Sequence, residues 1–203
     1  MAFRKPNLER KYPIIFKIGE ITEEIFFRSA KRIFPKIRRA TEREDLFERI
    51  DFFIERENQL WGVDVKGRRK RKRCGKDYAV VIEIVNKGGK YIFSKGFTHY
   101  AIENPFEKTF WIVPKLNILQ FLKTELNLRN IHTEAVPKFF SLYKRGKSIS
   151  YIVPEEYFFN RITPLERVPI NWREDMEIVE LLLEREKLRW EISEKCLQLS
   201  RYG

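Results

Sequence analysis

Residues 49–66 read RIDFFIERENQLWGVDVK, and this stretch decides the expected fold. Two short runs, 49–55 and 60–66, are rich in β-branched and aromatic residues, and the polar segment 56–59 separates them. Runs of this composition joined by a polar turn are typical of a β-hairpin. We therefore expect two antiparallel strands here.

The same stretch brings acidic and basic side chains together. Side chains alternate between the two faces of a strand, so Asp64 and Lys66 should emerge on one face, about 7 Å apart. Val63 and Val65 then share the opposite face. Pairing of the two strands would carry Asp51 toward Asp64, so the hairpin predicts two carboxylates and a lysine in one small volume. The alternative is a surface strand in which Asp64 and Lys66 merely face water.

Such a grouping has a chemical use. Hard divalent cations such as Mg²⁺ prefer carboxylate and water oxygens, and hydrolysis of a phosphodiester needs a metal that polarises the phosphate and acidifies a water. A nearby lysine can orient that water or offset negative charge in the transition state. Glu83, in the apolar run 78–85, has no lysine two residues later, and we interpret it as a salt-bridge or surface residue rather than a ligand.

Helical and extended patterns flank the hairpin. Residues 18–34 have the spacing of an amphipathic helix, and Pro35 should end it. We expect four strands at 78–85, 90–94, 98–103 and 109–113, a helix at 115–128, and a second hairpin formed by 138–144 and 148–153.

The chain length favours one domain with an appendage. We expect residues 1–170 to form an α/β domain with its core at about 15–125, followed by a helical extension at 171–203. The long helix predicted at 172–200 has two apolar stripes. One could pack on the domain, and the other could make a homodimer or a scaffold.

The charge balance points to a polyanionic partner. The chain carries 41 Lys and Arg against 29 Asp and Glu, a formal net charge of +12. Seven basic residues crowd into a loop at 67–76: Arg68, Arg69, Lys70, Arg71, Lys72, Arg73 and Lys76. Phosphate contacts by such a loop would bind nucleic acid strongly and without sequence preference. The alternative is a solvated loop or a localisation signal.

Other sequence features exclude some classes of protein. Two cysteines, Cys74 and Cys196, cannot build a disulfide framework or a zinc ribbon. No apolar run approaches the length needed to span a bilayer. We therefore expect no membrane partner and an intracellular, cytoplasmic location, or a location in the host cell if the chain is encoded by a virus.

The order of these features resembles the PD-(D/E)XK nuclease superfamily, which has the restriction-endonuclease-like fold. Its first hairpin carries a hydrophobic residue plus Asp, matched by Ile50-Asp51, and then an acidic residue-x-Lys, matched by Asp64-Val65-Lys66. Many members also place a Glu on the first helix about four residues after a Gly, which Gly19 and Glu23 match, with Glu20 as a second candidate. The Pro that names the motif is absent before Asp51.

The resemblance implies a fold and an activity. The fold would be a mixed central sheet flanked by helices, and the activity a Mg²⁺-dependent nuclease, with Mn²⁺ as a substitute, acting as an endonuclease with DNA favoured. Asp51, Asp64 and Glu23 would form the metal shell, and Lys66 would position or activate the attacking water. The rival hypothesis is a non-catalytic nucleic-acid-binding protein that uses the basic loop at 67–76.

Overall fold

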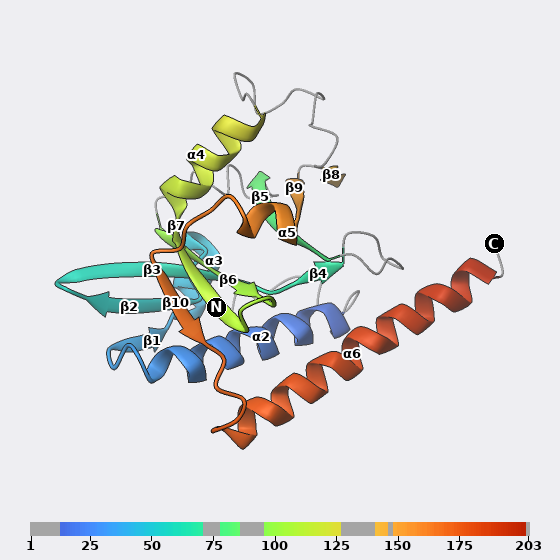
Figure 1. Cartoon of the computed structure of the whole chain (residues 1–203), viewed down its shortest axis with the longest axis horizontal. Helices are drawn as coiled ribbons and strands as arrows, with labels where there is room; N and C mark the ends of the chain where they lie inside the picture. Colours follow the sequence, from blue (N-terminus) through green and yellow to red (C-terminus); the bar gives the residue numbers. More distant parts are fainter. Residues whose placement is uncertain (1–12, 71–77, 86–95, 127–140, 146–147, 202–203) are drawn as a thin grey trace.

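The computed structural model describes residues 13–70, 78–85, 96–126, 141–145 and 148–201 (Figure 1). Within them the chain forms an α/β structure with a six-stranded sheet and a four-stranded sheet. The helices are α2 (Pro13–Lys31), α3 (Glu42–Glu48), α4 (Lys115–Leu126), α5 (Glu155–Phe159) and α6 (Met176–Arg201). The strands are β1 (Ile37–Arg39), β2 (Phe52–Arg56), β3 (Gln59–Lys66), β4 (Arg69–Lys70), β5 (Tyr78–Val85), β6 (His99–Asn104), β7 (Thr109–Pro114), β8 (Ser141–Arg145), β9 (Ser148–Pro154) and β10 (Glu166–Pro169).

The hairpin predicted at 49–66 is present as β2 and β3. The two strands pair antiparallel, with Arg56 opposite Gln59. The turn residues Glu57 and Asn58 both have positive φ angles, 50° and 62°. Two consecutive residues of this kind make the tight hairpin turn whose twist matches that of the flanking strands.

The six-stranded sheet is mixed, as the family resemblance implied. Its order is β1-β2-β3-β6-β7-β10, and β3 pairs parallel with β6 while the other neighbours pair antiparallel. The second sheet has the order β4-β5-β9-β8. Strand β3 therefore lies inside the larger sheet. The side chains of Asp64 and Lys66 are only 4% and 17% exposed, so the alternative in which they face water is wrong.

Apolar side chains cover both faces of the larger sheet. On one face, Ile25 and Phe26 of α2 pack with Phe52, Val63 and other sheet residues. On the opposite face, residues from the second sheet, α4 and α5 form another cluster that includes Tyr100 and Trp111. A strand covered on both sides cannot keep a charged residue cheaply, so a buried Asp64 needs a specific reason.

Helix α6 lies against α2 and runs antiparallel to it (Figure 1). Arg28 and Lys17 of α2 pair with Glu177 and Glu184 of α6 respectively. Ile178 of α6 is fully buried in the core between α2 and the sheet. One stripe of the predicted helix therefore packs on the body of the protein.

Several predicted boundaries differ from the observed ones. Helix α2 already includes Pro13, five residues before the expected start. It ends at Lys31, before Pro35. The short elements β1, α3, β4, α5 and β10, of two to seven residues each, were not predicted.

Some predictions lie outside the described residues. These are the strand at 90–94, the ends of the predicted segments at 127–128 and 138–140, and most of the basic loop. In the described part of the chain, no helix is both long and apolar enough to cross a bilayer.

Candidate active site

Asp51 lies just before β2, in a backbone position that is fixed from both sides. Helix α3 begins with a capping box in which Thr41 and Glu44 bond each other's backbone N–H groups, and it ends at Arg49 in the left-handed conformation. The chain then turns so that the N–H of Asp51 donates to the Val63 carbonyl, 2.9 Å away, and its carbonyl accepts from the Ala40 N–H at 2.8 Å. Asp51 was predicted inside a strand, but it belongs to the turn that leads into one.

The Asp51 side chain reaches across to β3. Its Oδ2 accepts a hydrogen bond from the Val65 N–H at 2.6 Å. Asp64 is the neighbour of Val65 and has only 3% of its surface exposed. The structure therefore brings Asp51 and Asp64 together, as the hairpin pattern predicted.

Lys66 completes the predicted group. Its Nζ lies 2.8 Å from Oδ1 of Asp64, and the two residues occupy the same face of β3. The side chain of Lys66 is 17% exposed, so the pair is largely shielded from water. Trp61, Val63 and Val65 lie in the core with α2, on the opposite face.

The carboxylates interact strongly. Burial raises the pKa of Asp51 well above its ordinary value, and the negative charges of Asp64 and Glu23 raise it further. The charge of Lys66 and the Val65 hydrogen bond oppose this rise. A group of acids that hinder each other's ionisation indicates a site that would be stabilised by added positive charge.

The lysine stays charged. Burial alone would lower its pKa, but Asp64, Glu83 and Asp51 together raise the pKa of Lys66 above its ordinary value. An ammonium group of this kind donates hydrogen bonds and cannot remove a proton from water at neutral pH. This charged form suits the first of the two predicted roles, in which Lys66 orients the water by donating a hydrogen bond to it.

These residues open on one cavity of about 500 Å³. Its charged and polar lining includes Glu20, Thr22, Glu23, Asp45, Arg49, Asp51, Asp64, Lys66, Arg68, Tyr78, Glu83 and Arg189. The elements that contribute are α2, α3, β3, β5 and α6. A cavity of this size accommodates a nucleotide-sized ligand.

The structure distinguishes the two glutamates of α2. Both line the cavity, but Glu20 is exposed, and its charge acts on Lys17. Glu23 is half-buried, and its charge acts on Asp51. Of the two glutamates, Glu23 is therefore the one whose charge acts on Asp51, a predicted metal ligand.

Six polar or charged cavity residues were not predicted as site residues: Thr22, Asp45, Arg49, Tyr78, Glu83 and Arg189. Glu83 was interpreted as a salt-bridge or surface residue, and it does act electrostatically on Lys66, but it does so from the cavity wall. Arg189 lies 123 positions after Lys66 in the sequence and reaches the same cavity from α6. No local pattern in the sequence links Glu83 or Arg189 to the hairpin.

The basic loop is only partly described. Arg68 is half-buried, forms a two-bond contact with Glu155, and lies 4.0 Å from the centre of the Tyr78 ring. Arg69 and Lys70 form β4, while Arg71, Lys72, Arg73 and Lys76 lie outside the described residues. Arg68 is thus a wall residue of the cavity and not a member of a solvated loop.

The donor set suits a hard cation that keeps its water. Among the described residues, no three His, Cys, Asp or Glu side chains are grouped closely enough to hold a metal ion as they stand. Mg²⁺ is usually held by one or two carboxylates and retains several waters, so Asp51 and Asp64 would be its direct ligands and Glu23 would act through water. A fully protein-coordinated zinc or calcium site does not fit these residues.

Comparisons with protein-family models, with curated proteins and with solved structures gave no match for this chain. The interpretation of the site therefore depends on its own geometry and on the motif.

Proposed function

We propose that this protein is a Mg²⁺-dependent nuclease that hydrolyses phosphodiester bonds, an endonuclease with DNA as its favoured substrate, on a core of the restriction-endonuclease-like type. One observation carries the proposal. Asp51, Asp64 and Lys66 come from two segments thirteen residues apart, and they meet with Glu23 of a separate helix at one cavity. If Asp64 and Lys66 had come together by chance on one strand, there would be no reason for Asp51 and Glu23 to lie at the same cavity.

Each residue has a role that its environment supports. Asp51 and Asp64 would hold Mg²⁺, and Glu23 would complete the shell through water. The bound ion would polarise the phosphate and acidify a water. Lys66, fixed by Asp64, would orient that water and offset the charge that develops on the phosphate.

The rival function is binding without cleavage. In that case the Lys66–Asp64 contact is simply an ion pair, and Asp51 serves only to accept the Val65 hydrogen bond. The raised pKa of Asp51 weighs against this, because a structural carboxylate is usually stabilised by its neighbours and not opposed by them.

The test compares metal-dependent cleavage with binding. Nicking of a plasmid, and cleavage of a branched DNA and of an RNA, are measured with Mg²⁺, with Mn²⁺ and in a chelator. Lys66→Ala should lower the cleavage rate by about 10²- to 10³-fold, the range for removal of a group that stabilises charge in the transition state. Its DNA affinity in chelator should stay within a few-fold of wild type, because one charge among 41 contributes little.

Lys123→Ala is the matched control. Lys123 is an exposed lysine on α4 and does not line the cavity, so the substitution removes the same charge elsewhere. It should cut at the wild-type rate. Absence of metal-dependent cleavage of DNA and RNA by the wild type, or full activity of Lys66→Ala, would sink the nuclease proposal in favour of the binding function.

A further inference from the structure

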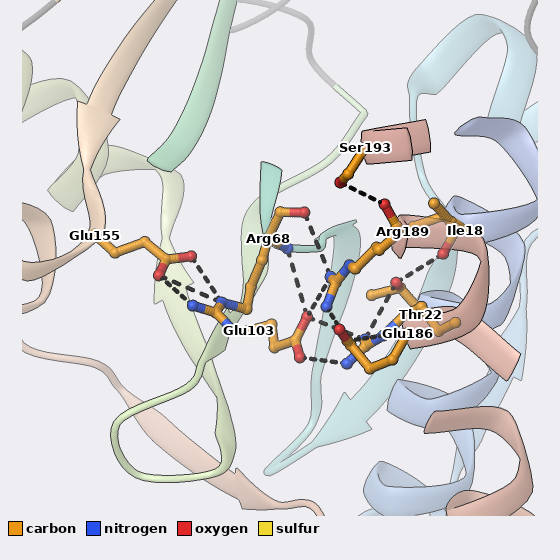
Figure 2. A network of polar contacts seen from close by, with 9 residues as sticks. Ile18, Thr22, Arg68, Glu103, Glu155, Glu186, Arg189 and Ser193 are labelled. Atoms are coloured by element: carbon orange, nitrogen blue, oxygen red, sulfur yellow. Dashed lines mark hydrogen bonds and ion pairs between the residues drawn. The ribbon is translucent and has the colours of Figure 1, made fainter. Parts of the chain in front are cut away.

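A buried ionic network joins α6 to the cavity wall. Arg185 and Arg189 are 2% and 7% exposed and stand one turn apart on the face of α6 that meets the sheet. Both approach Glu103 of β6, which is 5% exposed. Figure 2 shows Arg189 between Glu103 and Arg68, with Glu155 on the far side of Arg68.

The two α6 arginines have different tasks. Arg185 makes a two-bond contact with Glu103, at 2.7 and 3.0 Å, and does not line the cavity. Arg189 lies 3.7 Å from the same carboxylate, at the limit of an ion pair, and it does line the cavity. Arg185 therefore anchors the helix, while Arg189 presents its guanidinium to the cavity.

The contacts of Arg189 are weak enough for its guanidinium to exchange one anionic partner for another. It donates to the Arg68 carbonyl at a distance of 3.4 Å and to the carboxylate of Glu186. The Glu186 side chain is 56% exposed, and an ion pair with an exposed partner contributes little to stability. An anion that enters the cavity can replace Glu186 at small cost.

The charges at this wall balance only when the exposed carboxylate of Glu186 is counted. Three guanidinium groups, those of Arg68, Arg185 and Arg189, stand against two buried carboxylates, those of Glu103 and Glu155. Arg68 and Arg189 both approach the ring of Tyr78, at 4.0 and 5.9 Å from its centre. Arg68 also follows Lys66 with only Gly67 between them, so this wall continues directly from the carboxylate group.

We propose that Arg189 binds a phosphate of the nucleic acid inside the cavity, so that α6 supplies a substrate-positioning residue. The planar guanidinium can donate two parallel hydrogen bonds to non-bridging phosphate oxygens. Arg68, held by Glu155, stands beside it. This inference rests on the proposed function and extends it, because it names the group that would hold the substrate next to the metal ligands.

The experiment measures binding of a short DNA duplex in chelator by fluorescence anisotropy, over a range of salt concentrations. Arg189→Gln should weaken binding about tenfold to a hundredfold and reduce the slope of log affinity against log salt by about one. Arg189→Lys should restore the slope and part of the affinity, since it keeps the charge and loses the fork. Lys187→Gln is the matched control, because Lys187 is exposed on the same helix two residues away, and it should bind like wild type.

A second variant should change the DNA affinity in the opposite direction. Glu186→Gln frees the guanidinium of Arg189, so binding should become several-fold tighter. Glu180→Gln removes another exposed acid from the same helix and should have a smaller effect. A purely structural Arg189 predicts no gain from Glu186→Gln, and this comparison holds even if Arg189→Gln does not fold.

The outcomes separate the two proposals. Wild-type affinity and slope in folded Arg189→Gln would overturn the role of Arg189, whether or not the wild type cuts DNA. A wild type that binds but never cuts would overturn the nuclease proposal, while a tenfold loss in Arg189→Gln would still support the phosphate site. Equal effects of Glu186→Gln and Glu180→Gln would count against Arg189, because they would reflect net charge alone.

Discussion

Replacing Asp51 by asparagine should stabilise the metal-free protein, and the gain should depend on pH in a defined way. The pKa of Asp51 in the fold is raised well above its ordinary value of about 3.8, by burial first and then by Asp64 and Glu23. Between the ordinary and the raised pKa, the folded chain holds a proton that the unfolded chain releases. Stability contributed by Asp51 is therefore complete below the ordinary pKa and is lost as the pH rises.

The size of this pH dependence follows from the single proton that Asp51 holds in the folded state and releases on unfolding. Across that window the free energy of unfolding of the wild type should fall by about 1.4 kcal/mol for each pH unit on account of Asp51. The substitution Asp51→Asn removes this dependence, and the new side chain can still accept the Val65 hydrogen bond through its amide oxygen. A difference of ~1 kcal/mol corresponds to roughly 2 to 4 °C in melting temperature for a chain of this size.

The assay is urea unfolding of both proteins in chelator at several pH values from 4 to 8. The difference between the variant and the wild type should be small near pH 4, grow as the pH rises and then level off. Addition of Mg²⁺ should stabilise the wild type more than the variant at neutral pH, because the ion binds the ionised carboxylates of the folded state. Parallel pH curves, with the asparagine variant less stable throughout, would show that Asp51 is a structural carboxylate and refute the reasoning.

Three further predictions test other parts of the structure. Lys66→Met should bind Mg²⁺ at least as tightly as the wild type, since it removes a competing cation from Asp64. Asp64→Asn should bind Mg²⁺ more weakly, because it removes a carboxylate ligand. Calorimetry measures both affinities, and a change of the Mg²⁺ affinity in the same direction in the two variants would contradict this prediction. Arg185→Met should destabilise the fold by roughly 3 to 5 kcal/mol in urea unfolding, because it leaves Glu103 buried without its main partner, and a loss below about 1 kcal/mol would refute the anchoring role. Neutralising residues 68–73 should weaken binding to all DNA sequences about equally and flatten its salt dependence, and an unchanged slope would remove this stretch from the binding surface.

The sequence could predict the hairpin because its signals are local. Alternation at period two assigns Trp61, Val63 and Val65 to one face and Asp64 to the other, and Asn58 tolerates the positive φ that the tight turn requires. The alternation does not say whether the polar face meets water or protein. That depends on what covers this face, and Tyr78 and Glu83 of β5 and Arg189 of α6, which line the cavity with Asp64, come from later parts of the chain.

Short elements escaped prediction for a related reason. Strand β10 has the sequence ERVP and is held by its pairing with β7 and by the burial of Val168. Four residues carry too little periodicity to identify a strand, and a proline at the end lowers the strand propensity further. Its position at the edge of the sheet, where a missing N–H is tolerated, becomes visible only once β7 is in place.

The cavity as a whole could not be read from the hairpin, because its charges come from five elements. Six acidic and four basic side chains line it: Glu20, Glu23, Asp45, Asp51, Asp64 and Glu83 against Arg49, Lys66, Arg68 and Arg189. An excess of negative charge repels a phosphate, and Lys66 is already engaged by Asp64. A substrate can then approach only if a cation neutralises the carboxylates or if the guanidinium wall holds the phosphate. The proposed metal and Arg189 would both offset this negative charge, and for this reason the tightest DNA binding is expected when both are present.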